Sequence, residues 1–584
     1  MDTQRSNFAI KLLPSLTDFA FLMPVVFLFG RMDGVKTLLG DCDTGWHIRT
    51  GEWILAHGWV PSHDIFSFSK PGAPWFAWEW LSDVLFAKLN GLGGLQAVVL
   101  FSILLLSLTF TALFLQVRRK ASPIVAISIT MLAAAASSIH WLARPHLFTL
   151  FFLVLFFAAL ERVREGRTRL AGVPYLVILP VVTVLWTNLH GGFFVGALMI
   201  AAFGAGEMLT IAFSADPSLR VPAWRHARAY FLSSLACMAA SLINPYTYRL
   251  HVHMAQYLRD PFNSQHIVEF LSPTFHHPMA VFFEAMLVLS VATAIWNVSR
   301  GRFAEPLLMV VWAHGSLLAA RNIPIFMIAA APPVAAAIQE WLLLLPEIRV
   351  AAWLRNAGRR FNGLSAEMGQ TESIGRWHLV SAAGVLLVAA LLYAPHPPRK
   401  FRSEFDPKSY PAGALATLGR DPSARIFTYD QWGDYLIWSG HKVFVDGRSD
   451  FYGDDFEERL IDVLNVKYGW EKTLGRFGVD TILMPPTAPL TGALKESSRW
   501  QVVYDDGIAL VFRSTRKFGN ATASVIGAGD GDGVAREAGK SRARDLPVID
   551  AQNKMAAQNK MAAQTKIGTK REIGAKSKTL ERTL

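Results

Sequence analysis

Two aspartates begin a polar stretch that directly follows a hydrophobic one. The stretch DCDTGWHIRTGEWI, residues 41–54, places Asp41 and Asp43 two positions apart, followed by His47 and Arg49. Carboxylates at this spacing can supply a general base with a partner, or hard oxygen ligands for a divalent cation. One of them can instead cap the helix that the segment predicts, and capping needs only one carboxylate.

More groups of this kind stand at the ends of other hydrophobic stretches. Glu79 lies later in the same loop, and the short segments HWLARPH, TNLHGG, INPYTYRLH and ARNIP are polar too. Arginine matches phosphate oxygens in a bidentate way, and histidine can relay protons. The residues concerned are Arg144, His146, Asn188, His190, Asn244 and Arg321. A single such residue is more often a cap or an interface anchor, so a shared site requires that all of them lie on one face.

The elements that must position these residues are membrane-spanning helices. Of the 584 residues, 52% are hydrophobic and 17% are charged, and the mean hydropathy is +0.29. These values are typical of integral membrane proteins. The net charge of +12 does not indicate nucleic-acid binding, because the basic residues fall in short clusters between apolar stretches. Cys42 and Cys237 give no disulfide framework.

Apolar stretches of about 17 to 25 residues can cross the hydrocarbon layer as helices. The sequence predicts about eleven: 17–38, 95–117, 121–142, 146–160, 173–189, 191–213, 229–244, 279–298, 306–320, 323–345 and 377–395. Arginine and lysine gather in alternate connections, which are cytoplasmic by the positive-inside rule. The polar segments above then all face outward, and the chain emerges outside after residue 395.

We therefore expect an α-helical multi-pass membrane domain at 1–395, with its first outer loop at 40–94. Strand-like runs such as ARIFTY, HKVFVD, DTILMP and ALVFR predict a small extracytoplasmic α/β domain at 396–517, and we expect residues 400–517 to fold as an autonomous unit. In it, Asp446, Arg448 and Asp450 are expected to be exposed, where they contact an acceptor or cap turns. Residues 518–584, with the repeat NKMAAQNKMAAQ, predict a disordered tail.

The first loop resembles that of the GT-C superfold of membrane glycosyltransferases, whose hallmark is an acidic motif just after the first span. The resemblance lies in D-x-D-x-x-W-H-x-R-x-G-E, in P-x-x-D-x-F-S from Pro61 and in E-W-L from Glu79. Asp43 and Arg49 are six positions apart, similar to the D-P-W-F-N-Y-R element of the oligosaccharyltransferase catalytic subunit. No element like W-W-D-Y-G is apparent, so glycosylation of peptides is not supported.

The resemblance implies an inverting glycosyltransferase of the plasma (inner) membrane. Its donor would be a sugar on a polyprenyl phosphate, and its acceptor a glycan, lipid or protein on the extracytoplasmic face. The implied catalytic residues are Asp43, Asp41 and Glu79. The implied substrate-binding residues are His47, Arg49, Arg144, His146, Asn188, His190, Asn244 and Arg321. If Mg²⁺ or Mn²⁺ takes part, Asp41 and Asp43 are its ligands. Membrane lipid is an expected partner; protein partners stay open.

Two other classes remain open at this point. A secondary transporter places ionisable groups near the middle of the bilayer and often shows paired halves. Here His314 is the clearest polar residue deep within a predicted span, and no internal repeat is apparent. A non-catalytic scaffold for envelope glycan assembly would explain the outer domain without needing the acidic loop.

Overall fold

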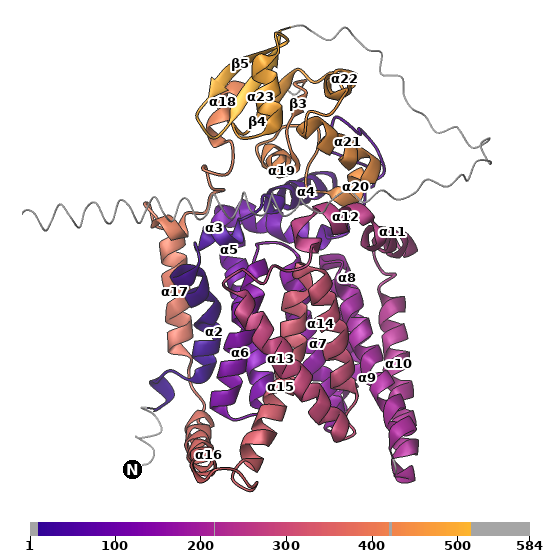
Figure 1. Ribbon diagram of the computed structural model, residues 1–584, viewed down its shortest axis with the longest axis vertical. Coiled ribbons are helices and arrows are strands. Elements are labelled where there is room, and N and C mark those ends of the chain that lie inside the picture. The colour runs from indigo at the N-terminus through magenta and orange to yellow at the C-terminus, as the bar shows by residue number, and fades with distance from the viewer. Residues whose placement is uncertain (1–9, 215, 420–422, 516–584) are drawn as a thin grey trace, which may run out of the picture.

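A bundle of long helices carries a small α/β region at one end (Figure 1). The computed structural model describes residues 10–214, 216–419 and 423–515, and the predicted tail at 518–584 lies outside them. Helix α4 (Asp43–His57) lies between the bundle and the α/β region. The first loop, which the sequence marks as the chemical one, is therefore covered on both sides.

Seven helical stretches in the described part of the chain are long and apolar enough to cross a membrane. They are Ile10–Arg31, which contains α2 (Leu16–Val26) and the π-helix η1 (Phe27–Arg31); α5 (Trp80–Arg118); Pro123–His140, made of α6 (Pro123–Ser137) and η2 (Ser138–His140); α7 (His146–Arg164); α9 (Phe193–Phe213); α13 (Ala280–Ser299); and Ala320–Leu344, made of η5 (Ala320–Asn322) and α15 (Ile323–Leu344).

Four further helices account for the rest of the eleven predicted spans. The helices α8 (Tyr175–Leu189), α14 (Ala304–Leu318) and α17 (Leu379–Leu392) are apolar but shorter. The fourth, α10 (Arg220–Ala240), is not in the apolar set and carries Arg220, Arg225 and Arg228 in its first half. Every predicted span thus contains a helix, but the number of eleven crossings is not confirmed.

Two boundaries differ from the prediction because glycine interrupts the helices. The first helical stretch ends at Arg31 rather than at residue 38, and Gly34 then adopts φ +65° before α3 (Val35–Leu38). The predicted second span starts inside α5, whose axis kinks at Gly93 and Gly94; Gly94 has φ +68°. Only glycine adopts such angles without strain. The segment before the kink brings Glu79 and Asp83 toward α4.

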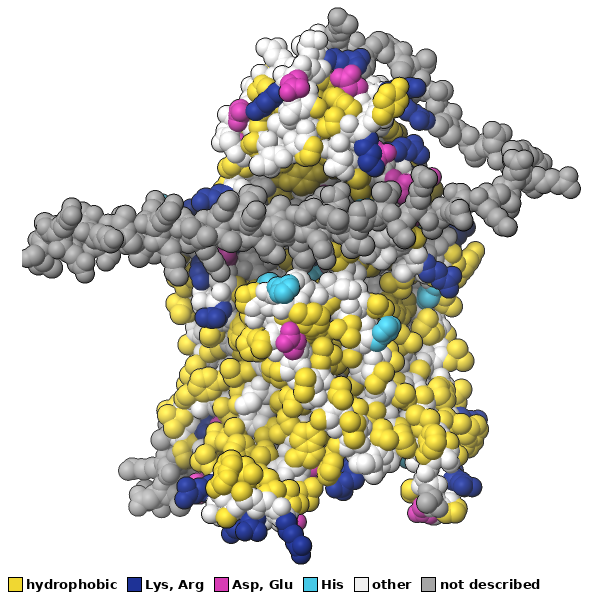
Figure 2. Space-filling view, viewed as in Figure 1, with side chains coloured by type: hydrophobic (Ala, Val, Ile, Leu, Met, Phe, Trp, Pro, Cys, Tyr) yellow, Lys and Arg dark blue, Asp and Glu magenta, His cyan; other side chains and the backbone are white. Residues whose placement is uncertain are grey.

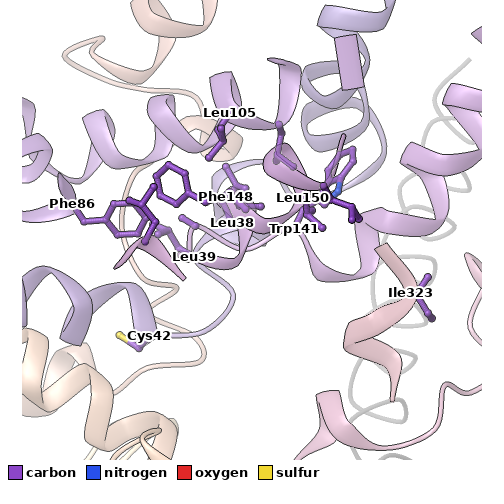
Figure 3. Close-up of a cluster of buried hydrophobic side chains, with 14 of the residues drawn as sticks. Leu38, Leu39, Cys42, Phe86, Leu105, Trp141, Phe148, Leu150 and Ile323 are labelled. Carbon is purple, nitrogen blue, oxygen red and sulfur yellow. The ribbon is translucent and has the colours of Figure 1, made fainter. Parts of the chain in front are cut away.

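The surface of the bundle has an apolar belt that suits a lipid environment. Figure 2 shows hydrophobic side chains covering the middle of the bundle, with Lys and Arg at the end opposite the α/β region. Inside, a hydrophobic cluster joins the elements around the first loop (Figure 3). Its members include Leu38, Leu39, Cys42, Phe86, Leu105, Trp141, Phe148, Leu150 and Ile323. This packing fixes the polar segments against one another.

The C-terminal region is built on a four-stranded sheet of order β3-β4-β6-β5. Strand β3 (Ile426–Phe427) pairs in parallel with β4 (Thr481–Met484), whereas β6 (Leu510–Ser514) is antiparallel to both β4 and β5 (Trp500–Asp505). Its helices are α18 (Leu415–Leu418), α19 (Asp430–Trp438), α20 (Ser449–Tyr452), α21 (Asp454–Leu464), α22 (Trp470–Arg476) and α23 (Pro489–Glu496).

The predicted strand at HKVFVD is reduced to isolated bridges, and one of them reaches the first loop. Val443 bridges in parallel to Ile426 and also to Ser67. Backbone hydrogen bonds run from Phe68 N to Val443 O (2.9 Å) and from Val443 N to Phe66 O (3.1 Å). The loop thus takes the place of a further strand at this edge. Strand β5 was not among the predicted runs.

The remaining elements are short or lie at the ends of the bundle. They are β1 (Arg169–Leu170), β2 (Val173–Pro174), η3 (Pro217–Leu219), α11 (Tyr248–Arg259), α12 (Pro261–His266), η4 (Val268–Phe270), α16 (Ala352–Glu372), η6 (Arg399–Phe401) and η7 (Ala412–Ala414). Helix α12 begins with a proline, which suits the first turn because no N–H is needed there.

Candidate functional site

Asp41 and Asp43 converge on the guanidinium of Arg144. Arg144 Nη1 lies 3.1 Å from Asp41 Oδ2, and Nη2 lies 2.8 Å from Asp43 Oδ2. The backbone sets this contact: Ala143 N donates to Leu38 O (2.7 Å), and Thr44 Oγ1 donates to Ala143 O (2.9 Å). Neither aspartate caps α4, since Cys42 is the N-cap residue. Both carboxylates are therefore available to the site.

A third carboxylate, Glu269, lies between two arginines. Its Oε2 lies 3.5 Å from Arg144 Nη1, and its Oε1 lies 3.2 Å from Arg321 Nη1. Although burial opposes ionisation, the two arginines hold the pKa of Glu269 at about 2. Sequence reasoning missed this residue, although it is the only acid between residues 261 and 279.

The three carboxylates around Arg144 do not titrate alike. Burial raises the pKa of Asp43 to about 7 despite the opposing effect of Arg144, and the nearby Asp41 and Glu269 charges add to the rise. Burial likewise raises the pKa of Asp41. A carboxylate with a pKa near neutral is suited to accept a proton from a hydroxyl group.

Glu79 is the centre of a second buried polar group. His190 Nε2 lies 3.3 Å from Glu79 Oε1, and His47 Nε2 lies 3.5 Å from Glu79 Oε2. His47 Nδ1 in turn contacts Asp83 Oδ1 at 2.6 Å. Burial raises the pKa of Glu79 to about 8, and it lowers the pKa of His190 to about 3. Burial also lowers the pKa of His47, so these shifts favour a protonated Glu79 between two uncharged imidazoles at neutral pH.

These groups border two cavities, of about 1310 Å³ and 770 Å³. Asp43, Arg144 and Arg321 line both. The larger cavity also contains Glu79, His146 and His190, and an apolar wall contributed by Trp46, Trp78, Leu150, Phe194, Val195, Trp312, Leu318 and Ile325. The smaller cavity is lined by Asp41, Glu269 and acids of the C-terminal region. Both together offer an apolar compartment, two arginines and a base.

Some residues expected to bind substrate lie elsewhere. Arg49 lines neither cavity; its Nη2 donates to Trp438 O (2.6 Å) and its guanidinium lies over the Trp438 ring. Asn188 accepts from Trp80 Nε1 (2.7 Å) and donates to Ile243 O (2.9 Å). Asn244 closes a turn by accepting from Tyr246 N (2.8 Å). Arg49 and Asn188 therefore connect separate elements, Asn244 shapes its own turn, and His47 lies behind Glu79.

Two residues of the C-terminal region are buried rather than exposed, contrary to expectation. Arg448 Nη2 lies 2.8 Å from Asp64 Oδ1 and 2.7 Å from Asp446 Oδ2, and the guanidinium and both carboxylates are almost closed to solvent. A buried charge persists when it is paired in this way. Arg448 and Asp450 both line the larger cavity and Asp446 lines the smaller one, and Asp450 also contacts His253 Nε2 at 2.9 Å.

The donor set does not fit a divalent cation. Within the described residues, no group of three or more His, Cys, Asp and Glu side chains is arranged to hold a metal ion. Asp41 and Asp43, the two proposed ligands, both point at the Arg144 guanidinium, which already supplies positive charge there. An octahedral cation would need these oxygens together with further oxygen ligands. We therefore assign no step to a metal.

Solved structures of similar fold are known. With an oligosaccharyltransferase from Archaeoglobus fulgidus, tethered to an acceptor peptide with the sequon NVT, the chain aligns at a TM-score of 0.50 and 12% identity, over 82% of this chain and 68% of the other. The apo form of the same enzyme aligns at a TM-score of 0.49 and 11% identity, over 82% of this chain and 69% of the other. Its complex with an inhibitory peptide and a dolichol-phosphate aligns at a TM-score of 0.48 and 11% identity, over 83% of this chain and 70% of the other.

The chain has the fold of this oligosaccharyltransferase. The sequence itself matches no family model and no curated protein. The expected likeness to the oligosaccharyltransferase catalytic subunit is confirmed at the level of fold. At 12% identity the likeness extends to the architecture and not to individual residues.

Proposed function

We propose that this protein transfers a sugar from a polyprenyl-phosphate-linked donor to a hydroxyl-bearing acceptor. The observation that carries the proposal is that Arg144, Arg321 and Asp43 all line the wall common to both cavities, where Arg144 contacts Asp43 directly. Guanidinium groups recognise phosphate oxygens, and a carboxylate with a pKa near 7 can take the acceptor proton. The GT-C-like fold supports the same reaction class.

The larger cavity supplies the apolar part of such a donor site. Leu150, Phe194, Val195, Trp312 and Ile325 come from spanning or apolar helices, so an isoprenoid chain would meet apolar surface on its way in from the bilayer. Arg144 and Arg321 would neutralise the phosphate as the leaving group develops charge. Asp43 would accept the proton of the attacking hydroxyl.

The charge pattern supports an extracytoplasmic position for the site. Figure 2 shows Lys and Arg side chains at the end of the bundle opposite the α/β region. The C-terminal ends of α5 and α7 carry Arg119, Lys120, Arg162 and Arg164. Under the positive-inside rule this end is cytoplasmic. The site and the C-terminal region are then extracytoplasmic in the plasma membrane, where a sugar carried by a flipped polyprenyl lipid is available.

Deletion of the gene tests the proposal in cells. We expect a polyprenyl-phosphate-linked sugar to accumulate and one extracytoplasmic glycan to lose that sugar, as measured by mass spectrometry of lipid extracts and of glycans. Wild-type protein should reverse both changes, and Arg144→Gln at equal abundance should reverse neither. Unchanged lipid-linked sugars and unchanged glycans in the deletion strain would refute the proposal.

A further inference from the structure

Helix α19 of the C-terminal region packs directly on α4. A Cβ added to Gly45 would lie 2.8 Å from Trp438 Cβ, so only glycine permits this approach. Arg49 secures it by donating from Nε (3.0 Å) and Nη2 (2.6 Å) to Trp438 O. The packing places Asp434, one turn earlier on α19, against the first residue of α4, which is Asp43.

The carboxyl groups of Asp43 and Asp434 meet over Gly447. A Cβ added to Gly447 would lie 2.7 Å from Asp434 Oδ2 and 2.8 Å from Asp43 Oδ1. The two carboxyl groups are in hydrogen-bond contact, and Gly447 N donates to Asp434 Oδ1 (2.8 Å). Asp43 Oδ2 faces Arg144. Each oxygen of Asp43 therefore has its own partner, one from the bundle and one from the C-terminal region.

Two buried carboxyl groups in hydrogen-bond contact need a proton between them, because two carboxylates would repel each other there. The proton belongs on Asp434, which is 1% exposed and has no cation among the described groups that act on it, whereas Asp43 is paired with Arg144. Burial raises the pKa of Asp434 in agreement with this. The other ionisable groups facing the pair are Asp41, Cys42, Glu269, Tyr410, Asp430 and Asp446.

We propose that Asp434 is a positioning residue for the reaction: as a neutral acid it donates a hydrogen bond to Asp43 Oδ1 and so completes the base from the C-terminal region. This rests on the proposed function of Asp43. The hydrogen bond fixes the carboxylate plane and stabilises its anionic form. The C-terminal region thus contributes a residue to the site and does more than cover it.

Infrared difference spectroscopy tests the pair without any substrate. The purified full-length protein in lipid nanodiscs at pH 7 should show a carboxylic acid C=O band that Asp434→Asn removes. The control variant Asp462→Asn, at a half-exposed residue on α21 of the same region, should leave it. Gly447→Ala, whose added Cβ pushes the two carboxyl groups apart, should shift the band. A wild-type minus Asp434→Asn spectrum without this band would overturn the proposal.

Rates of sugar transfer, measured with the lipid-linked sugar from the deletion strain, show whether Asp434 positions Asp43 or only packs against it. Asp434→Asn keeps a donor toward Asp43 and should stay within about threefold of wild type. Asp434→Ala loses the hydrogen bond, so turnover should fall by roughly 10- to 100-fold. The acid limb of its pH profile should move to higher pH, because the anion loses a donor.

If Asp434→Ala lowers turnover but leaves the pH profile unmoved, the role of Asp434 is purely structural and the proposal is overturned. An inactive Asp434→Asn at normal abundance would also overturn it. If wild-type protein transfers no sugar while the infrared band behaves as expected, the proposed function fails and the shared proton stands. The two ideas are therefore tested separately.

Discussion

Arg448 and Asp64 are 384 positions apart in the sequence, and their side chains lie 2.8 Å apart in a contact almost closed to solvent. Together with the bridge between Ser67 and Val443, this ion pair attaches the C-terminal sheet to the first loop. Lys70 Nζ adds hydrogen bonds to Phe451 O (2.7 Å) and Tyr452 O (2.9 Å). The loop and the C-terminal region therefore form one packed unit above the bundle.

Breaking this ion pair should loosen the C-terminal region. We expect Asp64→Asn to lower the free energy of unfolding by about 2–4 kcal/mol, because a buried guanidinium loses a charged partner. Thermal unfolding of the purified protein, with limited proteolysis after residue 400, measures the effect. The surface variant Glu404→Gln should stay within about 0.5 kcal/mol of wild type. Equal stability of Asp64→Asn and wild type would contradict the attachment.

The same contacts bear on the prediction that residues 400–517 fold alone. Expressed without the first loop, this segment lacks Asp64 for Arg448 and the backbone partners of Val443. We expect it to melt at a lower temperature alone than with an added peptide covering residues 60–78. A fragment whose melting temperature the peptide does not change would show that the segment is autonomous.

Glu79 should make stability depend on pH. Its pKa in the folded protein is about 8, above the ordinary 4.5. The protonated side chain therefore contributes fully to the free energy of unfolding below pH 4.5, and this contribution is lost as the pH rises through 8. Glu79→Gln keeps the shape of the protonated side chain but does not titrate, so it does not lose stability in this way. Between pH 7 and 8 we expect the variant to gain on wild type by about 1 kcal/mol in thermal unfolding. Parallel stability curves would contradict a protonated Glu79.

Glu269 should compete with the donor phosphate, because it lies between Arg144 and Arg321 where the phosphate would bind. Removing its charge takes one carboxylate away from each guanidinium group, although Arg144 keeps Asp41 and Asp43 as partners. We therefore expect Glu269→Gln to bind polyprenyl phosphate roughly tenfold more tightly, which corresponds to about 1.4 kcal/mol. Calorimetric titration in nanodiscs measures this, with Glu404→Gln as the control. Weaker binding by Glu269→Gln would show that Glu269 helps to hold the donor.

The helices could be predicted from the sequence, because the length of each apolar stretch indicates a helix directly. Several polar residues of the site could be predicted too, because they stand at the ends of these stretches. Asp43, Arg144, His146, His190 and Arg321 do line the larger cavity. Glu269 and Asp434 could not be predicted, since their roles come from pairing across the fold: η4 beside η5, and α19 on α4. The burial of Arg448 could not be predicted either, because its partner Asp64 lies far away in the sequence, in the first loop.

The measurement closest to the central claim is the rate of sugar transfer by Asp43→Asn, using the lipid-linked sugar from the deletion strain as donor. Asparagine keeps the shape of the side chain and cannot accept the proton, so turnover should fall by roughly 10²–10⁴ while polyprenyl phosphate binding changes little. Chelators should leave wild-type turnover unchanged, and Asp41→Asn should have a smaller effect. Wild-type turnover by Asp43→Asn, at normal abundance in the membrane, would contradict the account.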